Sequence, residues 1–253
     1  KLFGGSIPKT AKPEWKTTGV GFSDSMKVNP LTFKGKDGTG PTRSSHEVYD
    51  EINKRRTSSG ASYYIRGHLL SEKLHGPGKW KNMTPLSRTG NSQHESQVES
   101  KVKAAVESGG IVKYEVKPDY KQRSDKSALL STVESSDDNI NEKKAKKNIV
   151  ENEDHVPRSL YCKAVTVDAD GNKRSGWSIE KRVPNEIDRT FESYYLSSVS
   201  KPDPINLSND NKEDLETLPG IGKILAERII SYREEISRDF NTFTEIAEHV
   251  EGI

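Results

Sequence analysis

The stretch from residue 63 to residue 103 constrains the fold most, because its pattern changes from strand to loop to helix over a short distance. It opens with the β-prone run YYIRGH, and a loop rich in Gly, Pro and Lys follows. The last part has helical period, with Val98, Val102 and Ala105 at positions i, i+4 and i+7. We therefore expect a strand, a loop and a helix, in that order.

Side chains with useful chemistry lie at the two joints of this stretch. His68 ends the extended run, and its ordinary pKa of about 6.5 suits a general base near neutral pH. Asn91, Glu95 and Glu99 are spaced four residues apart, so they fall along one side of the helix. Amide and carboxylate oxygens are ligands of the kind that Mg²⁺ prefers. The stretch thus combines a candidate base with a candidate metal site.

Each of these residues also has a simpler explanation. A single His after a strand is more often a hydrogen-bonded structural residue than a catalyst. Asn91 could do no more than cap the helix, which is the commonest reason for an Asn at such a position. Only the order and spacing of these residues favour a functional role over the simpler explanations.

The motifs RGH, NMTPL and TGNSQHESQVE closely resemble those of the DNA/RNA non-specific endonucleases of the ββα-metal (His-Me finger) superfamily. The spacing from Asn82 to Asn91 is that of the family, and Glu99 falls where the family places a carboxylate. The family usually has Asp before the Arg of its first motif, and this chain has Ile65 there. That departure affects a supporting hydrogen bond rather than the base. The resemblance covers residues 42–120, and more loosely residues 156–184.

The resemblance implies a role for each motif residue. His68 would deprotonate the water that attacks a backbone phosphorus, and Arg66 would clamp a phosphate oxygen. Asn91 would bind Mg²⁺ or Mn²⁺, and Glu99 would hold a water ligand of that ion. Asn82 would order the loop between strand and helix. Cleavage would leave 5′-phosphate and 3′-hydroxyl ends.

Two further residues of the same motifs are candidates for supporting roles. His94 either touches the scissile phosphate or simply packs, and the sequence favours neither. Arg88 is a candidate contact to nucleic acid. The predicted fold class is α+β: a ββα-metal nuclease core with a mixed or antiparallel sheet, plus a small all-α domain.

The overall amino-acid composition limits how large a hydrophobic core the chain can form. Of 253 residues, 30% are hydrophobic and 31% are charged, so long surface loops are expected around a lean core. We assign residues 1–196 to the nuclease domain, with an irregular arm over 1–41. Residues 121–153 are interpreted as a mobile surface insertion, with a solvated helix as the alternative. Residues 156–184 predict a β-hairpin that extends the nuclease sheet.

The charge is unevenly distributed. Lys and Arg outnumber Asp and Glu by 20 to 12 in residues 1–120, balance them at 14 each in residues 121–200, and fall to 6 against 12 in residues 201–253. Basic residues near a phosphodiester backbone supply most sequence-independent affinity. The basic excess around His68 therefore fits a polyanionic substrate, although a solvated basic face would look the same.

The C-terminus contains a second recognisable unit. Residues 197–204 form a linker by composition, and residues 205–253 closely resemble a helix-hairpin-helix domain of the competence-protein type. Its hairpin LPGIG would bring backbone N–H groups close to a phosphate, and we expect contacts from Gly220, Ile221, Gly222 and Lys223. The acidic excess of this unit would repel DNA, so a protein-docking or structural role competes with DNA binding.

The predicted function is a metal-dependent, sequence-non-specific endonuclease acting on double-stranded DNA, with RNA as a second candidate substrate. A non-catalytic DNA-binding, uptake or repair adaptor is the alternative. No membrane-spanning run or signal segment occurs in the sequence, which also begins at Lys1. Because such nucleases often form the toxic end of secreted bacterial effectors, we expect a toxic nuclease domain. It would act in a target-cell cytoplasm and have an immunity protein as partner.

Overall fold

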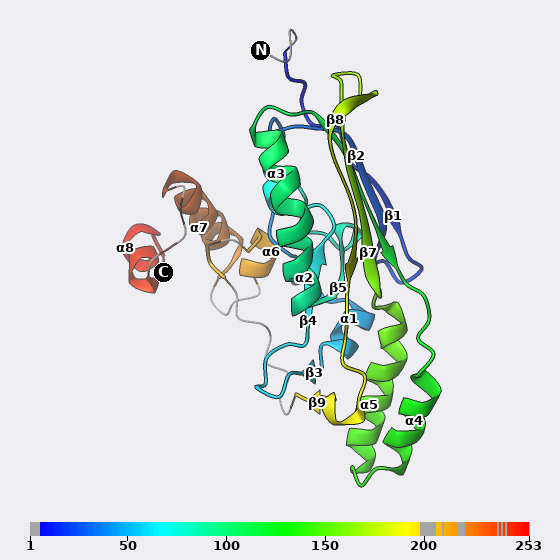
Figure 1. Cartoon of the computed structure of the whole chain (residues 1–253). Helices are drawn as coiled ribbons and strands as arrows, with labels where there is room; N and C mark the ends of the chain where they lie inside the picture. Colours follow the sequence, from blue (N-terminus) through cyan, green and yellow to red (C-terminus); the bar gives the residue numbers. More distant parts are fainter. Residues whose placement is uncertain are drawn as a thin grey trace.

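The largest sheet in the described part of the chain has five antiparallel strands. The computed structural model describes residues 6–197, 206–208, 210–216, 221–236, 238, 240 and 242–252. The strands follow the spatial order β1, β2, β6, β7, β8. Their bounds are β1 Glu14–Thr17, β2 Ser23–Leu31, β6 Val112–Asp119, β7 Ser159–Val167 and β8 Lys173–Pro184. The hairpin predicted for residues 156–184 thus becomes β7 and β8, which extend the sheet (Figure 1).

The ββα unit predicted for residues 63–103 lies on one face of this sheet. β4 (Tyr64–His68) pairs antiparallel with β5 (Met83–Ser87), and His68 lies opposite Met83. The loop between them contains two 3₁₀ turns, Glu72–Leu74 and Trp80–Asn82. β5 leads into α2 (Arg88–His94), a π-helical turn (Glu95–Glu99) and α3 (Ser100–Glu107).

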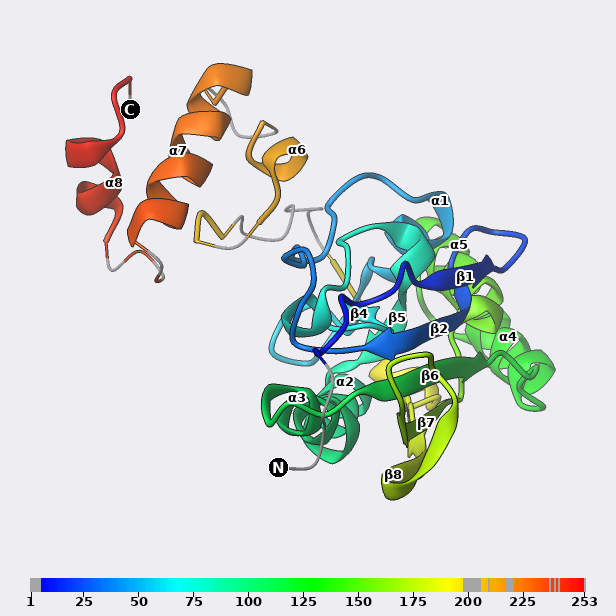
Figure 2. The ribbon, with the colours of Figure 1, turned by 90° about the horizontal axis from the view of Figure 1, so that it is seen from above.

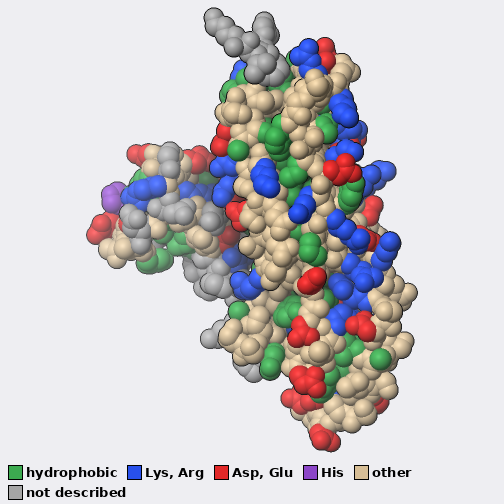
Figure 3. Space-filling model, viewed as in Figure 1, with side chains coloured by type: hydrophobic (Ala, Val, Ile, Leu, Met, Phe, Trp, Pro, Cys, Tyr) green, Lys and Arg blue, Asp and Glu red, His purple; other side chains and the backbone are tan. Residues whose placement is uncertain are grey.

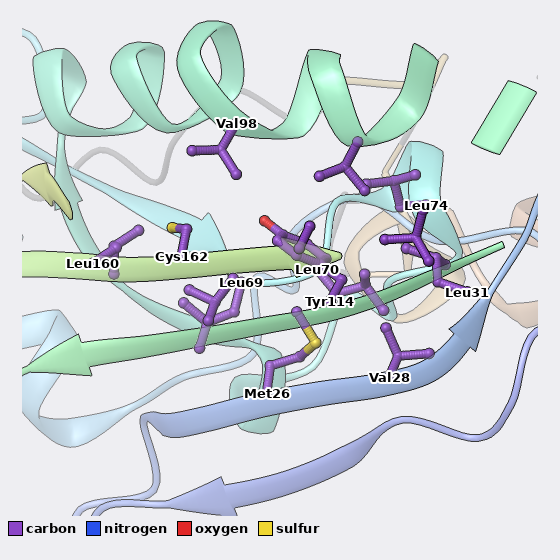
Figure 4. Close-up of a cluster of buried hydrophobic side chains, with 14 of the residues drawn as sticks. Met26, Val28, Leu31, Leu69, Leu70, Leu74, Val98, Tyr114, Leu160 and Cys162 are labelled. Atoms are coloured by element: carbon purple, nitrogen blue, oxygen red, sulfur yellow. The ribbon is translucent and has the colours of Figure 1, made fainter. Parts of the chain in front are cut away.

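The main core fills the space between the sheet and this helix. Val98, Val102 and Val106 point from the helix toward the sheet, as their helical spacing requires. From the sheet, buried side chains such as Met26 and Tyr114 meet them (Figure 4). Each fully buried aliphatic side chain contributes about 1.5–3 kcal/mol, so this layer fixes the helix against the sheet.

The N-terminal segment differs from the expected irregular arm. β1 and β2 lie within residues 1–41 and form one side of the sheet. Met26, Val28 and Leu31 of β2 are buried in the main core, and β2 pairs with β6. The alternation in β2 is short, and its partner strand lies far along the chain, so local pattern alone did not reveal it.

Residues 121–153 also differ from the interpretation as a mobile surface insertion. They contain two helices, α4 (Lys126–Ser135) and α5 (Ile140–Asn152), which pack on each other. Leu129, Ile149 and Val150 are buried there with Tyr194. Polar side chains cover the outer faces, which explains why the segment looked too poor in apolar residues to fold.

A buried polar network ties the second helix of this pair to the rest of the domain. Glu153, in the 3₁₀ turn Glu153–His155, is fully buried and accepts from Arg55 Nη1 at 2.6 Å and from the Tyr64 hydroxyl at 2.5 Å. Arg55 belongs to the two-residue strand β3 (Arg55–Arg56), which pairs with β9 (Tyr195–Leu196) after the 3₁₀ turn Phe191–Ser193. The short helix α1 (Glu47–Ile52) packs nearby through Tyr49 and Ile52.

The C-terminal unit is all-α over its described residues. It consists of α6 (Lys212–Leu215), α7 (Lys223–Ile236) and α8 (Phe243–His249), which share a small apolar core. Figure 2 shows these helices to one side of the sheet and its covering helices. The expected linker residues 198–204, and Gly220 of the hairpin, lie outside the described residues. Within the described part, no helix is long and apolar enough to cross a membrane. The predicted α+β class with a helical C-terminal unit is confirmed.

Candidate active site

One cavity of about 560 Å³ brings the predicted catalytic residues together. Its walls come from β4, from the helix that follows β5, from the segment before α1 and from the start of the C-terminal unit. The residues discussed below that line it are Arg43, Tyr49, Ser62, Arg66, His68, Lys73, Arg88, Asn91, Glu95, Glu99, Asn206 and Asp210. The whole lining carries four cationic side chains, Arg43, Arg66, Lys73 and Arg88, and four carboxylates, Glu72, Glu95, Glu99 and Asp210. Glu95 and Glu99 lie on the helix that follows β5 and form an acidic edge.

His68 is held at the end of β4 with one ring nitrogen engaged. Its Nε2 lies 3.1 Å from the carbonyl oxygen of Thr39. A carbonyl oxygen can only accept, so a neutral ring must carry its proton on Nε2 and leave a lone pair on Nδ1. Burial lowers the pKa of His68 to about 4, against the raising effect of the Thr39 hydrogen bond. The imidazole is therefore an unprotonated base at neutral pH.

Asn91 does not cap its helix. α2 begins at Arg88, and its N-cap is Ser87, whose hydroxyl accepts from Gly90 N at 3.0 Å. The capping explanation for Asn91 is therefore removed. Its side chain lines the cavity from the first turns of α2.

The π-helical turn after α2 shapes the acidic edge. Glu95 and Glu99 are the first and last residues of this turn, and both line the cavity together with Asn91. A π turn widens the helix locally, and such turns are frequent at functional sites. Glu95 is mostly exposed, with its Oε1 3.9 Å from Lys73 Nζ, whereas the Glu99 side chain is only 13% exposed.

Glu99 is a largely buried carboxylate, and one of its oxygens has no hydrogen-bond partner among the described residues. Its Oε1 is inaccessible and unpaired among the described residues, and the nearest ring nitrogen, His94 Nδ1, is 3.7 Å away. Burial raises the pKa of Glu99 to about 8, and the nearby Glu95 carboxylate adds to this. A cation beside this oxygen would offset the cost of burying the charge.

The residues present fit a hard divalent cation. Glu99 supplies an orphaned carboxylate oxygen, and Asn91 supplies an amide oxygen on the same cavity. Across the described part of the chain, no group of three or more His, Cys, Asp or Glu side chains has metal-ligand geometry. The protein would thus give few ligands, which suits Mg²⁺, an ion that usually keeps several waters.

Two arginines on the lining belong to the ββα unit, one on its first strand and one at the start of its helix. Arg66, on β4, has its guanidinium 4.4 Å from the ring centre of Tyr49 and 5.6 Å from that of Trp80. Such stacking holds the planar group in place on the cavity wall. Arg88, the first residue of α2, donates from Nε to the carbonyl of Ser62 at 3.2 Å.

Asn82 and His94 lie behind the cavity wall. Asn82 is fully buried, and its amide accepts from Leu70 N and donates to the carbonyls of Leu70 and Pro77, so it braces the loop between β4 and β5. His94 is 1% exposed, does not line the cavity, and has Nε2 3.2 Å from the Tyr114 hydroxyl. Burial lowers the pKa of His94 to about 4, so it is neutral beside Glu99. Of the two alternatives for His94, its placement favours packing.

Sequence reasoning missed a residue that holds the start of α2. Asn185, just after β8, is buried and accepts from Ser87 N at 2.8 Å. It also donates to the carbonyls of Pro157 and Pro85. A Cβ on Gly90 would lie 2.5 Å from Asn185 Oδ1, so this close contact requires glycine in α2. Nothing local in the sequence marks Asn185.

The C-terminal unit contributes to the cavity, which the sequence also did not indicate. Asp210 is 4% exposed, and its Oδ2 lies 2.9 Å from Arg43 Nε. The backbone N–H of Asn206 donates to the same carboxylate at 2.6 Å. Of the predicted hairpin contacts, Ile221, Gly222 and Lys223 are described; Gly222 and Lys223 are exposed, and Lys223 begins α7.

Models of known protein families match both units of the chain. The model of the DNA/RNA non-specific endonuclease family matches residues 37–139, and that of the helix-hairpin-helix motif matches residues 203–232. The chain therefore carries a hydrolytic endonuclease domain followed by a helix-hairpin-helix motif. The family indicated by the sequence motifs is thereby confirmed. No curated protein matches the chain.

Several solved structures are similar in part. NucA from Streptococcus agalactiae with a bound magnesium ion has 13% sequence identity, covers 78% of this chain and 84% of its own, and gives a TM-score of 0.47. Sda1 nuclease with a bound zinc ion has 16% identity, covers 70% and 75%, and gives 0.43. A structure described as an extracellular nuclease has 12% identity, covers 74% and 92%, and gives 0.38. Each TM-score is below 0.5, so the likeness to these structures is partial.

Proposed function

We propose that this chain is a metal-dependent, sequence-non-specific endonuclease that hydrolyses phosphodiester bonds of DNA, with RNA as a second substrate. The observation that carries the proposal is that His68, Asn91 and Glu99 line one cavity together with Arg66. Residues 1–196 would form the nuclease domain, residues 197–204 the linker, and residues 205–253 the helix-hairpin-helix domain.

His68 would act as the general base. Its Nδ1 takes a proton from a water molecule, whose oxygen attacks the backbone phosphorus as the bond from phosphorus to the 3′ oxygen breaks. The leaving 3′ oxygen gains a proton from solvent, which gives 3′-hydroxyl and 5′-phosphate ends. The lowered pKa of His68 supports this role, because the ring is unprotonated before the reaction. Arg66, stacked on Tyr49, would hold a non-bridging phosphate oxygen.

Asn91 and Glu99 would hold the metal ion, Mg²⁺ or Mn²⁺. When bound, the ion would stabilise negative charge that develops on the phosphate and the leaving oxygen. Asn82 would keep the loop beside the site ordered. His94, behind the cavity wall, would hold the Glu99 side chain in position. These roles rest on the placement of each side chain and on the unpaired oxygen of Glu99.

The helix-hairpin-helix unit would bind the DNA backbone without reading sequence. Gly222 and Lys223 at the start of α7, with Gly220 and Ile221 before them, would place backbone N–H groups and one positive charge beside a phosphate. The exposed position of Lys223 supports this. Docking of a protein remains the competing role for this unit, because residues 205–253 have 11 acidic residues against 5 basic ones.

The biological setting is proposed from the resemblance alone. The chain would be the toxic nuclease domain of a bacterial effector that reaches a target-cell cytoplasm, with an immunity protein as partner. Expression of the chain in bacterial cytoplasm should then arrest growth and degrade nucleic acid, and His68→Ala should relieve both effects. Normal growth with active enzyme present would argue for a housekeeping or nutritional nuclease.

The experiment that tests the enzymatic proposal is digestion of plasmid DNA and of RNA by the purified chain in Mg²⁺, in Mn²⁺ and in EDTA. We expect smearing of both substrates with either metal and none in EDTA. Cutting in EDTA would contradict metal dependence. No cutting in any metal, with retained DNA binding, would favour the non-catalytic adaptor.

A further inference from the structure

A second cavity, of about 470 Å³, lies where the sheet meets the helical pair α4 and α5, apart from the one that contains His68. It is lined by residues from the start of β7, from the end of β8 and from the segment before α4: Arg123, Arg158, Ser159, Arg182, Pro184, Asn185, Glu186 and Ile187. We call it the arginine pocket. Figure 3 shows Lys and Arg side chains gathered over the end of the sheet just above α4 and α5.

Arg123 carries polar atoms in this pocket that nothing in the described part of the chain satisfies. Its Nε and Nη2 are inaccessible and have no hydrogen-bond partner among the described residues. Burial lowers the pKa of the Arg123 guanidinium, and the charges of Arg189 and Arg158 lower it further, against the Glu153 carboxylate. Buried N–H donors of a charged side chain normally have hydrogen-bond acceptors. The lack of acceptors for Arg123 among the described residues indicates that a negatively charged group binds beside it.

The other two arginines leave the pocket positively charged. Arg158 is exposed, and its side chain has no hydrogen bond or ion pair within the part of the chain that the structure describes. Arg182 donates to Ser159 Oγ at 2.9 Å and lies 3.1 Å from Asp119 Oδ2, a pair in which the arginine is 64% exposed. Glu186 is the one carboxylate on the lining. The pocket thus has three guanidinium groups and one carboxylate, Glu186, on its lining. Asp119, which pairs with Arg182, lies outside the lining.

The pocket adjoins the helix of the proposed active site. Asn185 lines it and also accepts from Ser87 N, the N-cap of α2. Asn91 lies in the first turns of the same helix. A group bound in the arginine pocket would therefore sit next to the element that carries the metal site, at a position that a long polyanion could occupy together with the cavity around His68.

We propose that Arg123, Arg158 and Arg182 bind a backbone phosphate of the nucleic-acid substrate at a distance from the scissile bond. The inference rests on the proposed nuclease function and adds a subsite to it. A phosphodiester offers two charged oxygens, which match the paired donors of a guanidinium and would satisfy the buried atoms of Arg123. Such a contact would position the substrate and carry no sequence information.

Binding of a labelled 20-base-pair duplex tests the subsite without requiring cleavage. The parent is the His68→Ala chain in Mg²⁺, and dissociation constants are measured over a series of NaCl concentrations. Arg158→Ala should raise the dissociation constant roughly fivefold and lower the slope of log K against log salt by about one, since one phosphate contact is lost. Arg123→Gln should act in the same direction. Values equal to the parent for both variants would overturn the proposal.

Arg174→Ala is the matched control. Arg174 is exposed on the same strand β8 as Arg182, but it does not line the pocket. Its loss removes the same charge elsewhere and should leave the dissociation constant near that of the parent. An effect equal to that of Arg158→Ala would mean that only the overall charge matters, which would also overturn the proposal.

A small diester separates failure of the subsite from failure of the proposed function. With His68 intact, Arg158→Ala should leave the rate of hydrolysis of bis(4-nitrophenyl) phosphate unchanged. The same variant should lower the rate of plasmid cleavage at low plasmid concentration. If the unaltered chain cleaves neither substrate, the nuclease function fails, and duplex binding still tests the pocket. Titration with inorganic phosphate distinguishes the ligand source: phosphate binding lost in Arg158→Ala, together with unchanged duplex affinity, would reject a nucleic-acid phosphate.

Discussion

The cavity around His68 and the C-terminal helical unit use different means to place their functional groups. At the cavity, each proposed functional residue is backed by buried contacts: Asn82 braces the loop, His94 lies under Glu99, and Asn185 holds the start of α2. In the C-terminal unit, Gly222 and Lys223 are exposed above a small core of short helices. Hydrolysis requires groups fixed to fractions of an ångström, whereas a backbone phosphate contact tolerates more freedom.

The two regions also differ in charge. The part of the chain that carries His68 is basic, and the C-terminal unit is acidic. One of these acidic residues, Asp210, pairs with Arg43 on the cavity wall. We propose the chemistry for the first region because of its cavity, and substrate retention for the second because of its helix-hairpin-helix motif and in spite of its acidic charge. Four predictions test this difference.

The largest effect is expected from His68→Ala. Removing the proposed base should lower the rate of plasmid cleavage about 10³-fold, within the usual range for general base catalysis. His155→Ala, which removes a histidine outside the cavity, is the control and should cleave normally. Circular dichroism should show both variants folded. Cleavage by His68→Ala near the unaltered rate would remove chemistry from this region.

The next effect concerns the metal. Asn91→Ala should raise the Mg²⁺ concentration for half-maximal cleavage by about 10²-fold, since it removes an oxygen ligand. Asn141→Ala, an exposed Asn on α5, serves as control. Titration calorimetry of Mg²⁺ with both variants provides a readout apart from activity. Equal Mg²⁺ affinity in the two would show that Asn91 is not a ligand.

The pH dependence of cleavage sharpens the assignment of the base. Burial lowers the pKa of His68 to about 4, so the active, unprotonated form persists as the pH falls from 6.5 and is lost as it passes through 4. At pH 5 and saturating Mg²⁺, kcat/KM should be about 30 times higher than an unshifted histidine would allow. The profile of kcat/KM between pH 4 and pH 8 measures this. An acidic limb centred at 6.5 would contradict a base held in this desolvated position.

The smallest effect is expected in the C-terminal unit. Lys223→Ala should raise the dissociation constant for duplex DNA about threefold and lower the salt slope by about one, with hydrolysis of a small diester unchanged. Lys144→Ala, at an exposed position on α5, is the control. If both variants bind DNA like the unaltered chain, the unit is better explained as a protein-docking module.

Much of the ββα unit could be predicted, because its signals are local. The helix that contains Val98 and Val102 follows from their spacing, although the structure begins it at Arg88 rather than after Asn91. The hairpin of β7 and β8 follows from its turn. Two segments could not be predicted in this way. β2 is buried through pairing with β6, and α4 and α5 fold by burying a few residues against each other, so both depend on partners outside their own pattern.

The sequence by itself determined which residue types stand at which spacing: a histidine at the end of a strand, and an amide and a carboxylate on the helix that follows. Only the tertiary structure decided that these side chains share one cavity, that Ser87 rather than Asn91 caps the helix, and that Glu99 keeps an unpaired oxygen. It also decided which distant residues join them, since Asn185 and Asp210 reach the site only through folding. Spacing along the chain fixes local geometry, whereas burial and long-range hydrogen bonds exist only once the separate elements pack together.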